Sequence, residues 1–588
     1  MTGSDAVGWR RWAPGLEVLL SYDRSWLRGD LIAGVTVTAY LVPQVMAYAE
    51  IMGLPAVSGL WAVLVPMLLY AVLGSSRQLS IGPVSTTALM TAAAIAALVG
   101  PVDVQRRAEV AALVAVAVGV VCLIGWLARL GVVANLLSRP VLVGYMAGIG
   151  LLMVVSQYGK LTRLTITGNA PWEETASLFA QLGAVHVPTL VLGLAVTAAL
   201  FALRRWAPTW PGPLMVMLTA AAVVWLAGLS SEGIAVIGEV PRDLPVPAVP
   251  SLVGIDIAQL MLAALGIAVV GYSDVILTGR AFATKRGERI DATGELAAMG
   301  MANIANGFLA GFPVSSSASR TVIGDAAGSR TQLHSLVAAA MVLGTIFLFS
   351  PVLATFPQAA LGGVVVYAGL RLIDLKELRR LGRFRVSELV LALVTFAAVL
   401  ITGLLYGIGI AVGLSLLDLI RRIAHPHDGI LGYVPGIAGM HDVDDYPTAT
   451  QVPGLVVYRY DSPLFFANAD DFLTRALAAV QAARPTPHWF LLNAEANIEV
   501  DLTAVDTLEQ LRHTLADQGV VFAMARVKMD VREQLEAAGF LASVGEERVF
   551  ATLPTAVAGY ATWHENAFGT RPAGIPEATR TQPDKEEP

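Results

Sequence analysis

Apolar residues form long runs along the first 420 positions of the chain, and polar residues gather in short breaks between them. A helix that crosses a membrane needs roughly 20 apolar residues, and most of these runs approach that length. The pattern predicts a multi-span α-helical membrane region of about fourteen segments. They lie near residues 30–48, 55–73, 83–100, 108–128, 140–158, 188–203, 212–229, 256–279, 292–310, 314–326, 332–350, 357–372, 387–403 and 405–420.

The pattern changes beyond residue 423. Residues 424–452 are rich in Gly, Pro and Asp, which predicts a linker. Short apolar strands then alternate with amphipathic helices over 453–565, which predicts a small α/β domain. We expect its strands within "GLVVYRY", "HWFLLNA", "VVFAMARV" and "ERVFAT", and helices within "ADDFLTRALAAVQAA" and "LTAVDTLEQLRHTLADQG". Residues 1–29 are expected to form a cytoplasmic segment, and 566–588 a disordered polar tail.

Composition and charge agree with a membrane protein. The 588 residues are 55% hydrophobic and 14% charged, whereas soluble proteins average about 25% charged residues. The net charge of -6 is spread along the chain and no basic patch interleaved with aromatics occurs, so a nucleic-acid partner is not expected. Lys and Arg fall in alternate loops, which predicts both termini in the cytoplasm of a multi-pass protein of the inner (plasma) membrane.

Two similar motifs stand far apart within the apolar region. The first motif is "GPVSTTALM" at 82–90, and the second motif is "GFPVSSSASRT" at 311–321. Proline suits the first turn of a helix and hydroxyl groups can cap it, while a helix break inside a bilayer is tolerated only against protein or a wet cavity. We therefore predict two half-helices whose electropositive N-termini face a shared anion site at mid-membrane depth. The competing interpretation is a chance repeat of two loop turns.

Two charged residues lie within the apolar runs. An intramembrane arginine such as Arg320 costs about 2.5–3.5 kcal/mol on insertion scales, so it should face a cavity or a partner. Asp274 can bind a proton or a cation, and Thr278 lies one helical turn further on. Carboxylate and hydroxyl oxygens together would suit Na⁺. The competing interpretation is that Asp274 and Arg320 simply pair with each other.

Ordered motifs across nearly the whole chain resemble the SulP/SLC26 family of anion transporters. They are "PQVMAYAEIMGLPAVSGLWA" in the first span, the first motif, the second motif and the "GSRTQL" that follows it. The resemblance implies two inverted seven-segment repeats divided into a core and a gate domain, a cytosolic C-terminal STAS domain and a homodimer. It implies that the anion is held by side chains and backbone N–H groups of Gln44, Tyr48, Ser85, Thr86, Ser317, Ala318, Ser319 and Arg320. In the family, that arginine often acts from behind the anion.

The resemblance leaves substrate and coupling open. Proton-coupled members usually carry Glu at the position of Asp274, whereas "SDVILTG" is closer to Na⁺-dependent bicarbonate members and "VSSSASRT" to sulfate permeases. We expect proton-coupled sulfate uptake, with Na⁺-coupled bicarbonate uptake or dicarboxylate uptake as alternatives. A channel or a membrane anion sensor remains a rival class. An enzyme is not expected, because the spans show no zinc-type His–Glu spacing.

The C-terminal domain resembles STAS through "VDLTAVDTLEQL". Asp506 and Thr507 match a regulatory motif, but related anti-sigma antagonists are phosphorylated one position later, where Leu508 stands here. A packing helix is therefore favoured over a switch at these residues. His425, His427 and His441 lie in the Gly/Pro-rich linker and predict no metal site. No cofactor is expected apart from Na⁺ as a possible coupling ion.

Overall fold

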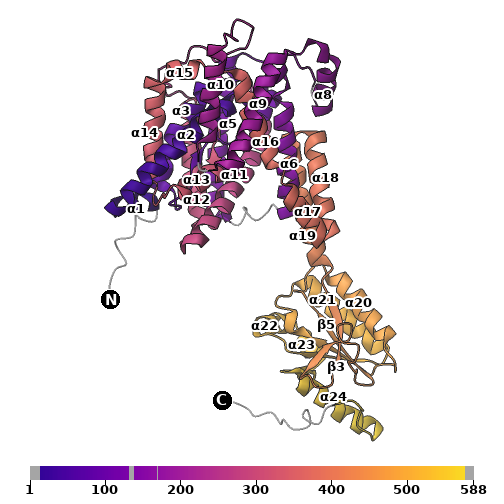
Figure 1. The fold of residues 1–588 in the computed structure, drawn as a ribbon. Coiled ribbons are helices and arrows are strands. Elements are labelled where there is room, and N and C mark those ends of the chain that lie inside the picture. The colour runs from indigo at the N-terminus through magenta and orange to yellow at the C-terminus, as the bar shows by residue number, and fades with distance from the viewer. Residues whose placement is uncertain (1–12, 132–137, 169, 209, 576–588) are drawn as a thin grey trace. The chain divides into compact units, whose positions relative to one another are not determined.

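The computed structural model describes residues 13–131, 138–168, 170–208 and 210–575. The chain divides into two compact units, one ending at Ser415 and one beginning at Leu416. The first unit is helical and the second is α/β (Figure 1). Each unit has its own apolar core.

Fourteen helices of the described residues coincide with the fourteen predicted segments. The first seven are α2 (Leu27–Ile51), α3 (Val57–Leu73), α4 (Ser85–Val99), α5 (Val104–Leu127), α6 (Arg139–Val155), α9 (Val187–Trp206) and α10 (Gly212–Leu226). The second seven are α11 (Ile257–Arg286), α12 (Ala292–Phe308), α13 (Ala318–Ala326), α14 (Leu333–Leu348), α16 (Gln358–Leu372), α18 (Val386–Thr402) and α19 (Leu404–Ala424). Shorter helices lie between or before them: α1 (Pro14–Leu20), α7 (Tyr158–Thr162), α8 (Pro171–Ala180), α15 (Ser350–Ala354) and α17 (Leu375–Phe384).

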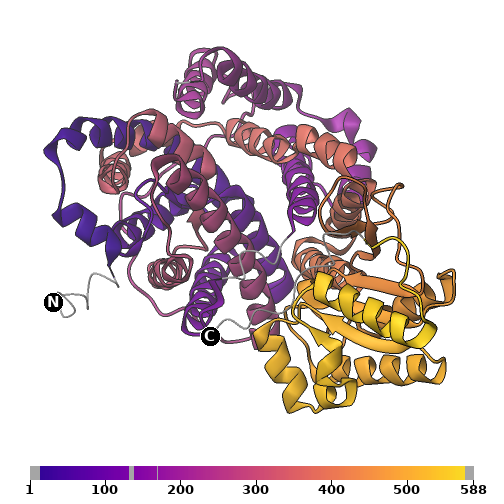
Figure 2. The ribbon, with the colours of Figure 1, turned by 90° about the horizontal axis from the view of Figure 1, so that it is seen from below.

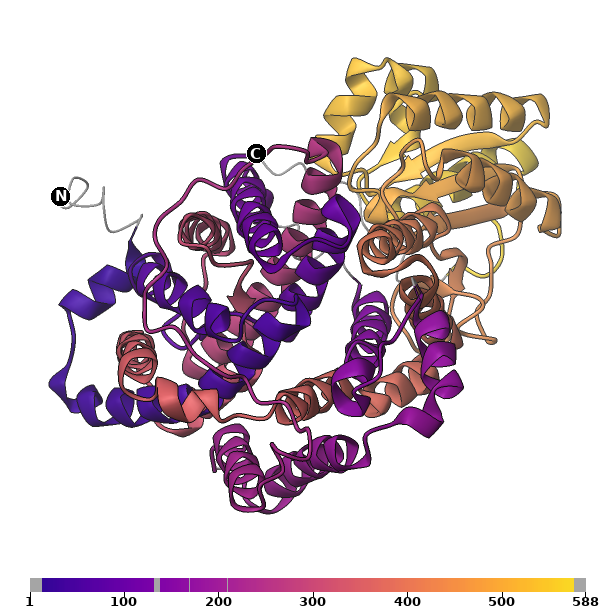
Figure 3. The same cartoon turned by 90° about the horizontal axis from the view of Figure 1, so that it is seen from above.

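The two sets of seven pack in a reciprocal manner. Helix α5 contacts α11 and α12, as α14 contacts α2 and α3; α4 contacts α11, as α13 contacts α2; and α6 contacts α18, as α9 contacts α16. The views from below and above show helices of the two halves interleaved, several of them nearly end-on (Figures 2 and 3). Helices α2–α5 and α11–α14 make one group, the core group. Helices α6, α9, α10, α16, α18 and α19 make the other, the gate group.

Small residues allow the closest helix pairs. A Cβ atom on Gly144 of α6 would overlap the carbonyl oxygen of Ala392 on α18, and one on Gly59 of α3 would overlap that of Val45 on α2. Both pairs therefore depend on glycine for backbone-to-backbone packing, which is the usual mode of helix association in lipid.

The α/β unit contains one six-stranded sheet in the order β4-β3-β5-β6-β7-β8. The predicted strands are β5 (Leu455–Tyr460), β6 (Trp489–Asn493), β7 (Val521–Ala525) and β8 (Val549–Phe550), and they are parallel. The predicted helices are α20 (Ala469–Ala482) and α21 (Leu502–Asp517). Further helices follow as α22 (Met529–Ala537), α23 (Phe540–Val544) and α24 (Leu553–Phe568).

The segment predicted as a linker contributes structure to this sheet. Strand β3 (Asp428–Tyr433) pairs antiparallel with β5, and β4 (Met440–Asp442) pairs with β3. The glycines of this segment made it resemble a linker, although buried and less buried positions alternate at the start of β3. Leu431 of β3 is buried in an apolar cluster of the α/β unit. At the other end, α24 extends three residues into the predicted tail, and positions 576–588 lie outside the described residues.

Candidate functional site

The two motifs meet at a short antiparallel pairing inside the helical unit. Strand β1 (Ile81–Gly82) precedes α4, β2 (Ser315–Ser316) precedes α13, and Ile81 stands opposite Ser316. The Ser317 N–H also donates to the Ser80 carbonyl at 2.9 Å. All these residues are buried. The extended stretches therefore satisfy each other's backbone groups, which is what two helix breaks inside a bilayer require.

The half-helices begin differently. Helix α4 starts after Val84, whose side chain makes no capping hydrogen bond. In α13 the Ser317 hydroxyl accepts from the Arg320 N–H at 3.4 Å. The first N–H groups of a helix have no partner within the helix and carry partial positive charge. The start of α4, without a side-chain cap, therefore offers the freer donors.

A cavity of about 230 Å³ lies against both helix starts. Nine of the ten predicted substrate and coupling residues line it, and Arg320 does not. The nine are Gln44, Tyr48, Ser85, Thr86, Asp274, Thr278, Ser317, Ala318 and Ser319. The lining also includes Met146, Pro213 and residues of α16, so both helix groups form the walls.

Three buried polar atoms at this cavity make no hydrogen bond to any described residue. They are Gln44 Oε1, Thr86 Oγ1 and Ser316 Oγ. Leaving a buried polar group unpaired costs about 1–3 kcal/mol. A polar molecule held in the cavity could supply the missing partners, and the two hydroxyls can donate to an anion.

Arg320 lies behind the cavity and is fully buried. Its Nη1 donates to the Pro83 carbonyl at 2.9 Å, and its Nε donates to Ser80 Oγ at 3.3 Å. Gly82 lets the guanidinium approach, because a Cβ there would lie 3.3 Å from Nη2. Arg320 therefore joins the start of α13 to the residues just before α4. It does not pair with Asp274 among the described contacts, so the interpretation that these two charges simply neutralise each other is wrong.

Asp274 and Thr278 both reach the cavity from α11. The partly exposed Asp274 side chain makes no hydrogen bond or ion pair with another described residue. Helix α11 is fixed against β2 by Ser315, whose hydroxyl donates to the Gly271 carbonyl at 2.7 Å. The carboxylate is therefore held beside the start of α13 with its oxygens available to a cation.

Sequence reasoning missed Arg371 and Tyr367, which line the cavity from α16. Arg371 is exposed, and its Cζ lies 5.8 Å from the centre of the Tyr367 ring. In the sequence, Arg371 fits the pattern of basic residues at helix ends that sets membrane orientation, so nothing in that pattern singles it out. Its spacing of four residues from Tyr367, on one face of a helix, was the signal that could have identified it.

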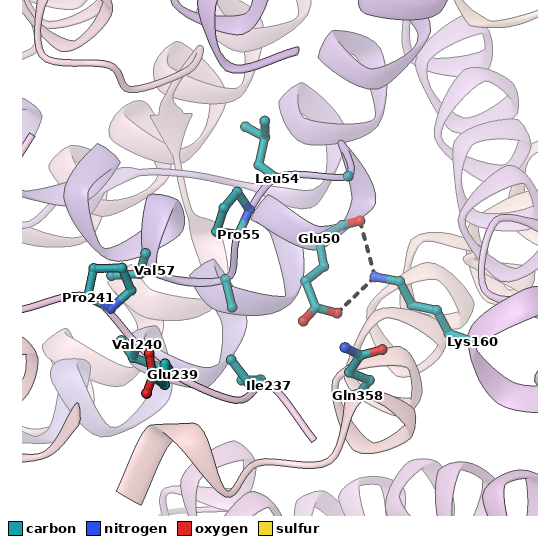
Figure 4. A pocket seen from close by; sticks show the side chains of 12 residues that line it. Glu50, Leu54, Pro55, Val57, Lys160, Ile237, Glu239, Val240, Pro241 and Gln358 are labelled. Carbon is teal, nitrogen blue, oxygen red and sulfur yellow. Dashed lines mark hydrogen bonds and ion pairs between the residues drawn. The ribbon is translucent and has the colours of Figure 1, made fainter. Parts of the chain in front are cut away.

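A second cavity of about 270 Å³ lies at the far end of α2 (Figure 4). There, Lys160 of α7 donates to the Glu50 carboxylate at 2.8 Å and to the Glu50 carbonyl at 3.1 Å. Gln358, at the start of α16, lies on the same wall. The ion pair thus connects α2 of the core group to the segment that follows α6 of the gate group.

In the α/β unit, Asp506 is exposed and the Thr507 hydroxyl donates to the Thr503 carbonyl at 2.9 Å. The cap of α21 is Asp501, which accepts from the Ala504 N–H at 2.8 Å. Leu508 is buried in the core. A regulatory role for Asp506 and Thr507 stays a prediction.

Comparison with known proteins identifies both parts of the chain. Residues 27–395 match the sulfate permease family and residues 446–556 match the STAS domain. A probable sulfate transporter of Mycobacterium tuberculosis (strain CDC 1551) is 56% identical over 546 residues, covering 93% of this chain and 97% of the relative. The chloroplastic sulfate transporter 4.1 of Arabidopsis thaliana is 28% identical over 559 residues, covering 90% of this chain and 79% of the relative.

Two solved structures share the fold. The murine solute carrier 26 family member A9, an anion transporter in the inward-facing state, matches with a TM-score of 0.85 at 22% identity, covering 95% of this chain and 96% of that one. The transmembrane domain of a cyanobacterial bicarbonate transporter matches with a TM-score of 0.58 at 22% identity, covering 67% of this chain and 98% of that one. The predicted fold class, a multi-span helical membrane protein with a STAS domain, is confirmed.

Proposed function

The chain belongs to the sulfate permease family, and we propose that it is a secondary active transporter that takes up sulfate by proton symport across the plasma membrane. The observation that carries the proposal is the cavity where the starts of α4 and α13 meet under a fully buried Arg320. Relatives named as sulfate transporters support the choice of anion.

The cavity can hold an anion in three ways. The N–H groups at the start of α4 offer hydrogen bonds and a positive dipole end. Arg320 adds a positive field from behind. Arg371 is the cation that can touch the anion, because its guanidinium is exposed at the cavity wall.

Coupling to a cation follows from the membrane potential. An inside-negative voltage opposes entry of each negative charge by about 2.3 kcal/mol per 100 mV. Uptake of doubly charged sulfate therefore needs co-transported cations, and Asp274 is the carboxylate that faces the cavity with no protein partner among the described contacts. A proton on Asp274 would reduce the negative charge of the loaded site.

Alternating access is supported by how the cavity is built. Residues of α2, α4, α11 and α13 form one side, and residues of α6, α10 and α16 form the other. A movement of the core group against the gate group would open this cavity to one side of the membrane or the other. We further propose that both termini are cytoplasmic, which protease access to each terminus from either side of the membrane can test, and that the protein is a homodimer, which chemical cross-linking in native membranes can test.

The second candidate is Na⁺-coupled bicarbonate uptake. It is favoured by one observation: Asp274 and Thr278 present two oxygen groups to the cavity one helical turn apart. Hard cations prefer such oxygen ligands. Dicarboxylates would compete for the same helix ends.

Uptake of radiolabelled anions into proteoliposomes under separate proton and Na⁺ gradients tests these proposals. Sulfate accumulation driven by a proton gradient supports the first, and bicarbonate accumulation driven by Na⁺ supports the second. Flux that follows voltage alone would indicate a channel. Anion binding without flux would indicate a sensor.

A further inference from the structure

Four basic side chains converge on a hollow at the membrane face where α2 begins. The hollow measures about 350 Å³ and is lined by Trp26, Arg77, Lys285, Arg286, Glu288 and Arg330. The cations come from three separate parts of the chain: the loop after α3, the last turn of α11, and the loop before α14. Their convergence is therefore a property of the fold and not of one basic run.

The hollow carries an excess of positive charge. Arg77 lies 3.7 Å from Glu288, and Lys285 and Arg286 share the single carboxylate of Asp325. Asp30, which accepts from the Arg330 backbone N–H, is a third acid beside the hollow, so four cations face three carboxylates and one positive charge is in excess. The exposed side chain of Arg330 makes no hydrogen bond or ion pair with any described residue, and only its backbone N–H is bonded, to Asp30.

The hollow adjoins an apolar surface. A second hollow, of about 500 Å³, shares Trp26 and Arg330 with the first. From Trp26 along α2, the side chains of Leu27, Leu31 and Val35 are 43%, 43% and 48% exposed, at about one per turn. Exposed apolar side chains on a membrane helix face acyl chains, and an indole at the helix end is typical of the headgroup level.

We propose that this hollow binds the phosphodiester headgroup of an anionic phospholipid, with an acyl chain lying along Leu27, Leu31 and Val35. Phosphate oxygens accept charge-assisted hydrogen bonds from arginine. The apolar strip formed by Leu27, Leu31 and Val35 favours a lipid over free phosphate, because a soluble anion has no apolar group that could pack against these side chains.

Such a lipid would act on the loop that supports the central cavity. Next to Arg330, the Gln332 amide donates to the carbonyls of Ser76 at 2.8 Å and Leu79 at 2.9 Å, just before β1. A headgroup bound to Arg77 and Arg330 would brace both loops. Lipid occupancy would thereby stabilise the pairing of β1 with β2.

The test uses the purified full-length protein in phosphatidylcholine nanodiscs with and without phosphatidylglycerol, and native mass spectrometry to count retained lipid. We expect the Arg77→Gln, Arg330→Gln double variant to lower retention of phosphatidylglycerol by about tenfold. The matched control, Arg379→Gln with Arg383→Gln, removes two exposed arginines of α17 that do not line the hollow. This control variant should retain phosphatidylglycerol.

A second variant and a competition experiment separate loss of lipid binding from misfolding and from binding of free phosphate. Arg330→Glu alone removes no side-chain hydrogen bond or ion pair of the described residues, so the variant should fold and should also lose the lipid. Inorganic phosphate should not displace phosphatidylglycerol. The proposal would be overturned if both hollow variants retained phosphatidylglycerol or if the α17 control lost it equally. Displacement of phosphatidylglycerol by inorganic phosphate would also overturn it.

Discussion

Replacing Arg320 with Gln should weaken sulfate binding much more than it weakens folding. The substitution removes a fully buried positive charge and the donors to the Pro83 carbonyl and the Ser80 hydroxyl. Each hydrogen bond from a charged donor contributes about 1.5–3 kcal/mol to stability. Burying a charge without a carboxylate partner costs several kcal/mol in return. The lost hydrogen bonds and the relieved cost of burying a charge oppose each other, so we expect the free energy of unfolding to change by less than about 2 kcal/mol.

The loss of sulfate affinity is not offset in this way, because removing the positive charge of Arg320 only weakens its attraction for the anion. For an anion held about 8 Å from the guanidinium, at an effective dielectric constant of about 20, the Arg320 charge would contribute roughly 2 kcal/mol per anion charge. That energy corresponds to about thirtyfold in affinity for a monovalent anion and more for sulfate. Arg320→Lys keeps the charge but loses the planar guanidinium, so it should lower sulfate affinity less than Arg320→Gln does.

Titration calorimetry of the purified protein with sulfate measures the affinities, and thermal unfolding of the same samples measures stability. Sulfate binding by Arg320→Gln at wild-type affinity would show that the helix ends suffice. A Lys variant as weak as the Gln variant would show that hydrogen-bond geometry, and not charge, is what matters.

Further substitutions test the other groups. Arg371→Gln should weaken sulfate binding by about tenfold and bicarbonate binding less, since Arg371 is exposed at the cavity wall; equal losses in competition assays would remove it from anion selection. Asp274→Asn should abolish gradient-driven accumulation while sparing binding, and unchanged accumulation would exclude it from coupling. Glu50→Lys and Lys160→Glu should each alter the uptake rate and partly compensate when combined, with a coupling of about 0.5–1 kcal/mol; additive effects would contradict a direct link. Hydrogen bonding to Arg512 lowers the pKa of Glu509 from 4.5 to about 2, so its stabilisation is present above pH 4.5 and is lost as the pH falls toward 2. This loss of stabilisation, about 1 kcal/mol after solvent screening, should appear as lower hydrogen-exchange protection factors in α21 at acid pH, with each observed rate compared with the intrinsic rate at the same pH, and Glu509→Gln should abolish this pH dependence.

Most of the helical fold could be predicted from the sequence, because apolar length and the absence of charge specify where a chain can cross lipid. The half-helices were also predictable, since Pro83 and Pro313 each precede a hydroxyl cluster where no ordinary span fits. The α/β unit was predicted from alternating strands and helices. Strand β3 was missed because its glycines resemble those of a linker.

Contacts between distant parts of the chain could not be predicted. The pairing of Ile81 with Ser316 depends on how two repeats interlock, which no local pattern encodes. Arg320 could be placed near the site but not tied to the Pro83 carbonyl. Arg371 could not be identified as a cavity residue, because a basic residue at a helix end can either set membrane orientation or line a cavity, and only packing separates the two.

The most direct measurement is the position of a selenate ion, a heavier analogue of sulfate, located by anomalous diffraction from crystals of the protein. We predict a single strong peak in the central cavity, within hydrogen-bonding distance of the backbone N–H groups at the start of α4 and close to Ser317 and Arg371. A peak elsewhere with this cavity empty, or one whose contacts omit both helix starts, would contradict it.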